Sequence, residues 1–270
     1  MKTRIIVAGL ALWAIFAVPT LSADPQYDAQ EIIQRSVEAN DADWKAGPQF
    51  DHFERDQQAH GGSKTYQVLM IMGSPYERLV AVNGAPLSPE QQAEEQQKLD
   101  AAITQRRNES EGERAERIAE YEKDRRRDHL LMEQLTEAFD FTLTGEQKLD
   151  GHDVYVLKAT PRVDYQPPNM ECQALRGMQG ELWIDKETFQ WVKVEAQVVR
   201  PVSIEGFLAR VEPGTRFELE KMPVEDGIWL PKHFAMKSQA RVLFFFRRTS
   251  QDDETYYGYR KAESFPGQAQ

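Results

Sequence analysis

The chain has 270 residues and a mass of 31.1 kDa, with 33 Lys and Arg against 44 Asp and Glu, so its formal net charge is −11. A balance this acidic argues against binding to nucleic acid backbones, which requires a concentrated positive field. The single cysteine, Cys172, excludes an intramolecular disulfide and any site built from several cysteines. Hydrophobic residues make up 40% of the chain, which is enough to form a core.

Residues 1–23 have the features of a secretory signal peptide. Lys2 and Arg4 form a short basic start, an apolar stretch follows as far as Val18, and the small residue Ala23 ends the segment. The apolar stretch is short for a membrane span of about 20 residues, although an uncleaved anchor stays open as an alternative. Cleavage would leave 31 basic and 44 acidic residues, so the net charge of the mature chain would be −13. No cysteine lies near the predicted cleavage site, so the lipid-attachment site of a bacterial lipoprotein is missing. We therefore expect a periplasmic, non-lipidated, acidic protein.

The beginning of the mature chain predicts one helix followed by strands. Residues 28–39 carry a partial apolar stripe with helical spacing. Residues 64–72 are apolar on both faces near their end, which is typical of a strand covered on both sides. Residues 77–82 predict a second strand, and Asn83-Gly84 is a turn signal.

Residues 88–128 differ from the rest of the chain, because 21 of these 41 residues are charged, 12 acidic and 9 basic. Ser88-Pro89 is a favourable helix start. We expect a solvent-exposed helical hairpin or one long helix broken near residues 108–112, continuing into an apolar face over 129–139. The Arg125–Arg127 run could form a patch for nucleic acid or anionic lipid, but a solvated helix face is the favoured interpretation. We treat 88–138 as a charged helical insert.

After residue 138 the sequence alternates between strands and turns. The expected strands are 139–144, 154–159, 182–185, 191–199, 215–221, 229–237, 239–247 and 255–261. Within 191–199, alternation places Val192, Val194, Ala196 and Val198 on one face and Lys193, Glu195 and Gln197 on the other. At least eight strands with short turns predict one large antiparallel sheet, open or nearly closed.

No motif predicts catalysis, a cofactor or a metal site. The five histidines form no pair with zinc-site spacing. His52 and His60 with Asp51 and Asp56 could form a loose metal site, but ordinary surface residues are the favoured interpretation. A buried Cys172 is likewise favoured over a nucleophile. Carboxylates are abundant, and no spacing singles out an acid/base pair. We therefore expect a protein that is not an enzyme.

Aromatic residues gather on the predicted strands, at Trp183, Trp191, Phe207, Phe217, Trp229, Phe234 and Phe244–Phe246. The simplest interpretation is a sheet core covered by the helices. A long curved sheet, however, has more concave area than two short amphipathic helices can fill, and the remainder could be an apolar cavity for one lipid-like ligand. Trp183, Trp191, Phe217 and Trp229 are the candidates for its lining, and each could equally belong to the core.

Three segments resemble the outer-membrane lipoprotein-sorting (LolA/LolB-like) superfamily. Residues 180–195 (GELWIDKETFQWVKVE) resemble its strand, Ile-Asp, turn, strand unit; residues 226–231 (DGIWLP) resemble a later element, and residues 149–157 resemble its usual hairpin. The resemblance implies a half-barrel of antiparallel sheet wrapped over helices, with an apolar cavity for acyl chains, in proteins that ferry or sense lipoproteins. The charged insert departs from the compact carriers, and the missing lipid-attachment cysteine disfavours the acceptor branch.

These observations predict an α+β chain with one LolA-like domain over residues 24–270, interrupted by the charged insert. The expected function is a periplasmic carrier that shields an acyl chain and takes part in lipoprotein sorting. Its expected partners are an acyl chain or lipidated protein, and proteins of the inner or outer membrane. The first alternative is a sensor or interaction protein that docks through the insert. The second is a hydrolase with a carboxylate pair.

Overall fold

The computed structural model describes residues 27–59, 61–204, 209–242 and 246–263. The predicted signal peptide, His60, Phe207, Phe244 and Phe245 therefore lie outside the described residues.

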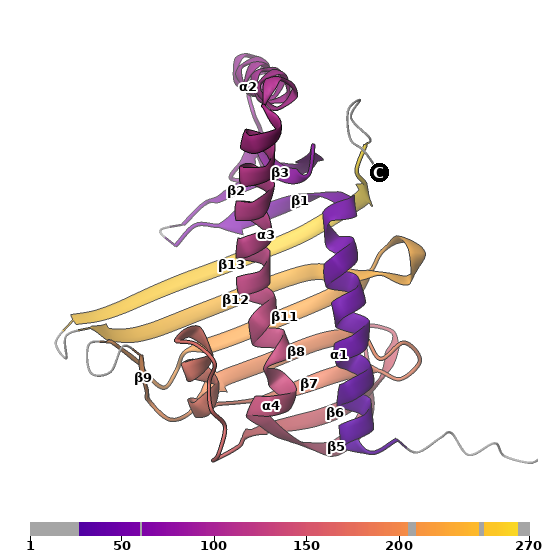
Figure 1. Ribbon diagram of the computed structural model, residues 1–270, viewed down its shortest axis with the longest axis vertical. Coiled ribbons are helices and arrows are strands. Elements are labelled where there is room, and N and C mark those ends of the chain that lie inside the picture. Colours follow the sequence, from indigo (N-terminus) through magenta and orange to yellow (C-terminus); the bar gives the residue numbers. More distant parts are fainter. Residues whose placement is uncertain (1–26, 60, 205–208, 243–245, 264–270) are drawn as a thin grey trace, which may run out of the picture.

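Thirteen strands form one antiparallel sheet in the order β4-β3-β2-β1-β13-β12-β11-β8-β7-β6-β5, with β10 pairing with β12 and β9 pairing with β10 (Figure 1). The strands are β1 Phe50–Gln57, β2 Ser63–Ile71, β3 Ser74–Val82, β4 Ala85–Pro86, β5 Phe139–Leu149, β6 His152–Pro161, β7 Met178–Asp185, β8 Trp191–Val198, β9 Val202–Ile204, β10 Ala209–Val211, β11 Arg216–Pro223, β12 Trp229–Val242 and β13 Phe246–Lys261. The sheet is open, because this path of pairings ends at β4 and β5. The expected large antiparallel sheet in an α+β chain is confirmed.

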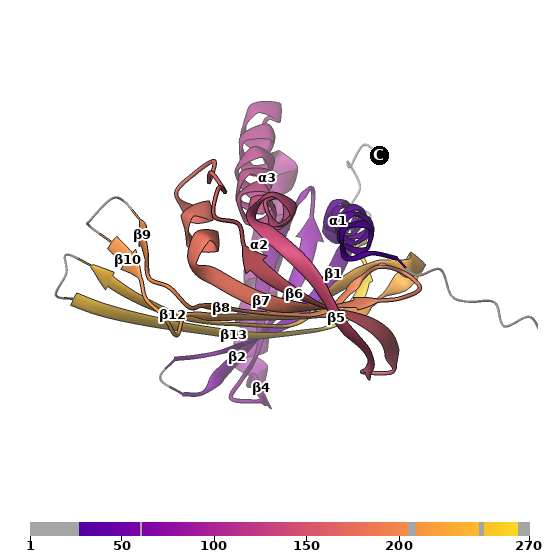
Figure 2. The ribbon, with the colours of Figure 1, turned by 90° about the horizontal axis from the view of Figure 1, so that it is seen from below.

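Helices α1 (Ala29–Ala46) and α3 (Glu111–Glu133) cross the same face of the sheet, which curves beneath them in Figure 2. We call this the inner face and the opposite one the outer face. The core lies between these helices and the strands. It includes Ile32 and Ile33 of α1 and Leu157, Leu182 and Ile184 of β6 and β7. The short helix α4 (Leu135–Ala138) continues α3 into β5, and the 3-10 helices η1 (Gly47–Gln49), η2 (Glu171–Gly177) and η3 (Glu225–Gly227) connect further elements.

Helix α1 is longer than the expected 28–39. It begins where the Asp28 carboxylate accepts a hydrogen bond from the backbone N–H of Glu31 at 2.8 Å, a normal N-cap. It extends to Ala46, and in this additional part the residues buried on the sheet-facing side, Asn40 and Asp43, are polar. A stripe of apolar residues alone therefore predicts too short a helix.

The charged segment forms two helices, α2 (Pro89–Asn108) and α3, separated at Glu109-Ser110. Ser88 and Ser110 each begin a helix with a capping box, in which the serine hydroxyl and a side chain three residues later exchange bonds with the backbone. Gly112, expected as an interruption, lies within the first turn of α3. The segment is not a free arm, because α3 supplies part of the inner-face cover and α2 packs on β2 and β3.

Two details of the sheet differ from the expected strands. Lys193 pairs with Trp183 and Trp191 pairs with Ile184, so Val192 is an extra residue in a β-bulge. Val192 therefore packs with Trp229 rather than sharing a face with Val194. The expected strand 239–247 is also divided, because 239–242 continue β12 and 246–247 begin β13.

Candidate functional site

An apolar cleft of about 210 Å³ opens on the inner face between α1 and α3. Its apolar lining residues are Val37 of α1, Met132 of α3 and Trp191 of β8, and its lining is completed by polar residues, namely Glu38, Asn40, Asp41, His129 and Glu133. The Trp191 side chain is only 2% exposed and belongs to the main core. At this cleft the helical cover of the core is therefore incomplete.

One end of the cleft is held by a stack of side chains between the two helices. The rings of Trp44 and His129 lie 4.2 Å apart and nearly parallel, at 11°. The Arg125 guanidinium lies 4.5 Å from the Trp44 ring centroid and donates a hydrogen bond to the Trp44 carbonyl. His129 Nε2 lies 3.5 Å from a carboxylate oxygen of Asp41 and 3.8 Å from one of Glu133. Aromatic and polar contacts thus fix α3 beside α1.

A buried ion pair holds α1 against the sheet. Asp43 Oδ2 lies 2.5 Å from Lys221 Nζ, which also donates to Asn40 Oδ1 at 2.7 Å. The other carboxylate oxygen of Asp43 accepts from Gln190 Nε2 at 3.1 Å and from the Trp229 backbone N–H at 3.0 Å. Burial lowers the pKa of Lys221, while Asp43 opposes that change. This network explains why the polar end of α1 faces inward.

The four predicted lining residues do not lie together. Trp191 belongs to the inner-face core, and Phe217 packs against that core. Trp183 and Trp229 instead pack with Val154 in a separate apolar cluster. By strand alternation, Val154 faces away from the core residues of β6. The four residues therefore line no single cavity, and of them only Trp191 borders the cleft.

Apolar side chains continue along the inner face away from Trp191. Phe217 and Leu219 of β11 pack on the core but remain half-buried. Phe234 on β12 is also half-buried, and its ring meets that of Phe217 edge to face at 5.5 Å. An apolar chain longer than the cleft would find further apolar surface in this direction.

The inner face changes character at β1 and β13, where ionisable groups gather. Glu54 pairs with Tyr256 across the strands, and the Tyr256 hydroxyl donates to Glu254. Burial, together with the negative charge of Glu254 and other nearby carboxylates, raises the pKa of Glu54 to about 7. Burial lowers the pKa of His52 to about 4, and its ring lies 5.2 Å from that of Tyr259. Carboxylates and hydroxyl groups therefore make this region more polar than the part of the inner face around Trp191.

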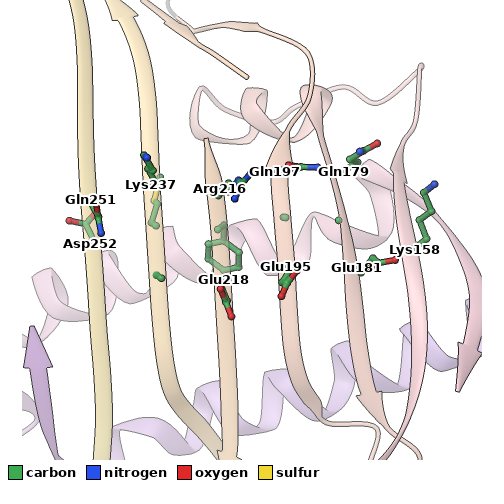
Figure 3. A pocket seen from close by; sticks show the side chains of 15 residues that line it. Lys158, Gln179, Glu181, Glu195, Gln197, Arg216, Glu218, Lys237, Gln251 and Asp252 are labelled. Carbon is green, nitrogen blue, oxygen red and sulfur yellow. The ribbon is translucent and has the colours of Figure 1, made fainter. Parts of the chain in front are cut away.

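A second hollow crosses the outer face. It measures about 740 Å³, and Figure 3 shows its polar side chains on strands that lie in front of the helices. Cross-strand pairing aligns Lys158, Glu181, Glu195 and Glu218 in one row and Gln179, Gln197, Arg216, Lys237 and Gln251 in the other. These side chains are charged or amide groups and most are exposed. The hollow is a polar trough and not an acyl cavity.

The other residues that the sequence singled out are buried or paired with carboxylates. Cys172 is fully buried in η2, as expected. Arg125 and Arg127 of the predicted basic patch form ion pairs with Glu122 and Asp124. Within the described ranges, no three His, Cys, Asp or Glu side chains converge on a possible metal position. None of the described helices has the length and apolarity needed to cross a membrane.

Comparison with known proteins gives matches among solved structures alone. A scan against protein-family models finds no match, and no curated protein matches the sequence. A LolA superfamily protein from Nitrosomonas europaea is 14% identical with a TM-score of 0.32, covering 89% of this chain and 96% of that one. A putative outer membrane lipoprotein-sorting protein domain from Vibrio parahaemolyticus is 12% identical with a TM-score of 0.33, covering 87% and 95%. MucA/MucB from Pseudomonas aeruginosa gives 12% identity, a TM-score of 0.27, and coverage of 87% and 99%.

Members of the superfamily that the sequence resembles are thus among the structures similar to this chain. At these identities and TM-scores the likeness carries no functional information. The proposal below therefore rests on this chain's own residues.

Proposed function

We propose that the protein is a non-enzymatic periplasmic carrier that holds an acyl chain, free or on a lipidated protein, between its helices and the inner face of its sheet. The observation that supports this most directly is the apolar cleft between α1 and α3 beside Trp191. The LolA-like resemblance of residues 180–195 and 226–231 points to the same ligand class.

The size of the cleft defines how a ligand would fit. About 210 Å³ is below the ~300–1,000 Å³ of a typical ligand pocket, so the cleft receives only part of an acyl chain. The rest would lie along the half-buried apolar side chains of β11 and β12, including Phe217 and Phe234. Each buried methylene contributes about 0.8 kcal/mol, so even a partly enclosed chain can bind.

A fluorescent fatty acyl probe tests this proposal with the purified mature protein. We expect saturable binding by the wild type. Met132→Trp fills the cleft from α3 and removes room for about two methylenes, so we expect its Kd to be about tenfold higher. Met132→Leu nearly conserves volume and serves as the matched control, with a Kd close to that of the wild type.

Two results would contradict the proposal. One is a folded wild-type protein that binds no acyl probe. The other is unchanged binding by Met132→Trp and also by Val37→Phe, which narrows the same cleft from α1. Thermal melts of all variants establish that each is folded.

A second candidate function is docking of a partner protein on α2. Leu99 is the one buried residue of this helix, and most of its other side chains are exposed, so the side of α2 that faces away from the sheet offers a polar surface of mixed charge. Because α3 is part of the inner-face cover, deletion of residues 88–128 cannot separate the two functions. A photo-cross-linker placed at the exposed Gln97 can separate them. If α2 docks a partner protein, the cross-linker should give one discrete adduct. The Glu94→Lys variant should lose this adduct and keep its acyl binding.

A further inference from the structure

The floor of the cleft between α1 and α3 carries a buried hydrogen-bond donor. The two helices supply all of the lining residues except Trp191, which comes from the sheet. The Trp191 side chain is 2% exposed, and its indole Nε1 is buried without a hydrogen-bond partner among the described residues. An indole N–H can only donate, and a buried one usually has an acceptor. Leaving such a donor unpaired costs stability, so the group calls for a partner.

The polar side chains nearest in the cleft are already engaged. Asn40 Oδ1 accepts from Lys221 Nζ at 2.7 Å, and Asp41 Oδ2 lies 2.6 Å from Lys45 Nζ. Met132, by contrast, lines the same cleft with an unbranched and flexible side chain, which an entering ligand can displace. An oxygen atom of the ligand is therefore the suitable acceptor for the indole N–H.

The charge around the cleft restricts which oxygen this can be. Three carboxylates, those of Glu38, Asp41 and Glu133, lie among its lining residues. Asp41 has Lys45 as its partner, whereas within the described ranges Glu38 and Glu133 form no ion pair with a lysine or arginine. Anionic groups disfavour a further anion beside them, so a carboxylate or phosphate is unsuitable. The carbonyl oxygen of an ester or amide is uncharged and accepts hydrogen bonds, so it meets both conditions.

We propose that the cleft binds the carbonyl group of an acyl ester or amide, which accepts a hydrogen bond from Trp191 Nε1, and that Glu38 and Glu133 select against free fatty acids. The acyl chain then runs from this carbonyl along the half-buried apolar side chains of β11 and β12. This inference rests on the proposed acyl binding and adds the class of the ligand and its orientation.

Three probes with the same chain and a fluorophore at the methyl end test the inference at pH 8. One ends in a free carboxylate, one in an N-methyl amide, and one in a methyl ether that lacks the carbonyl. We expect the purified mature protein to bind the amide about tenfold more tightly than the ether, because only the amide accepts from the indole. We also expect the amide to bind about tenfold more tightly than the carboxylate, because of the charge around the cleft.

Two variants separate the hydrogen bond from the charge. Trp191→Phe keeps an aromatic ring but removes the N–H, so the amide and the ether should bind it equally. The double variant Glu38→Gln, Glu133→Gln should bind the carboxylate about fivefold more tightly than the wild type and the amide unchanged. The matched control is Glu181→Gln, Glu187→Gln, which removes the same charge at exposed positions outside the cleft and should leave all three Kd values unchanged.

Several results would overturn the inference. If none of the probes binds, the acyl-binding function itself fails. If the probes bind but the ether or the carboxylate binds as tightly as the amide, acyl binding stands and this inference fails. If Trp191→Phe does not fold, the indole N–H resonance of Trp191 in the wild type replaces it. This resonance should move downfield with the amide and not with the ether, and an unchanged resonance would count against the hydrogen bond.

Discussion

The buried pair between Asp43 and Lys221 joins α1 to the sheet through charge and hydrogen bonds as well as apolar packing. Both side chains are almost fully buried, at 3% and 7% exposed. Taking two charges out of water is costly, and the additional bonds from Gln190 and the Trp229 backbone help to compensate. Replacing such a pair by apolar residues is often neutral, so we expect the pair to fix the position of α1 more than to add net stability.

Removing one partner of this pair should be strongly destabilising. Asp43→Ala leaves the Lys221 ammonium buried without its carboxylate, and we expect the free energy of unfolding to fall by about 3–5 kcal/mol. Urea denaturation measures this change. Glu31→Ala is the control, because Glu31 pairs with Arg35 on the exposed side of the same helix, and a loss below about 1 kcal/mol is expected. Equal losses in the two variants would show that the buried network does not act as described.

Glu54 should make stability depend on pH. Its pKa rises from 4.5 to about 7 on folding, so below pH 4.5 it is protonated in both states and costs nothing. Between pH 4.5 and 7 the unfolded chain loses the proton first, so stability falls as pH rises. Above pH 7 the full cost of the buried charge is present.

The variant Glu54→Gln removes this cost. We expect it to raise the free energy of unfolding by about 1–3 kcal/mol at pH 8 and to leave it unchanged near pH 4. Chemical denaturation across this pH range measures the difference from the wild type. Glu187→Gln, at an exposed turn position, should show no such dependence. A pH-independent difference for Glu54→Gln would contradict the assignment.

At the scale of elements, the junction of α2 and α3 is fastened to the turn between β2 and β3. The Arg106 guanidinium donates to the carbonyls of Ile71, Ser74 and Pro75, each at 2.8 Å. Arg117 Nη1 donates to Ser74 Oγ at 2.6 Å and thereby ties α3 to the same turn. Beside these contacts, α2 packs apolar residues on β2 and β3. The two charged helices are thus part of the folded body.

Loss of Arg106 should loosen α2. Arg106→Met keeps much of the side-chain volume but leaves three carbonyls without their donor, and hydrogen bonds to charged groups contribute about 1.5–3 kcal/mol each. We expect faster proteolysis within 89–110 and a lower free energy of unfolding. Arg107→Met changes the exposed neighbouring position and should have no measurable effect. Unchanged proteolysis of Arg106→Met would show that apolar packing alone holds α2.

For the whole molecule, features set by local sequence could be predicted. The turns at Asn83-Gly84 and Asp150-Gly151 have positive φ at both residues, which is what Asn-Gly and Asp-Gly favour. The Ser88 start of α2 and the sheet itself follow from capping and alternation. The bulge at Val192 could not be predicted, because it depends on how β8 pairs with β7.

The candidate site could be predicted only in part, for the same reason. Trp191 is prominent in the sequence, and it does border the cleft. His129 and Met132 were missed, because their place in the cleft depends on α3 lying beside α1. Asp43 was missed because a polar residue near a helix end normally indicates solvent. Its partner Lys221 lies 178 residues away, and no sequence pattern joins them.

The pairing of β1 with β13 has a consequence for how the molecule forms. In the described sheet, the hydrogen-bonded path from the β1–β3 strands to the β5–β12 strands passes through β13. A ribosome makes β1 early and β13 near the end of the described chain, so the two parts wait for almost the whole of synthesis before they can join. Until then β1 and β12 each present an open edge, the feature that promotes pairing with other chains. Assembly through such distant contacts is slow, so we expect the chain to be prone to aggregation until β13 has paired with both edges.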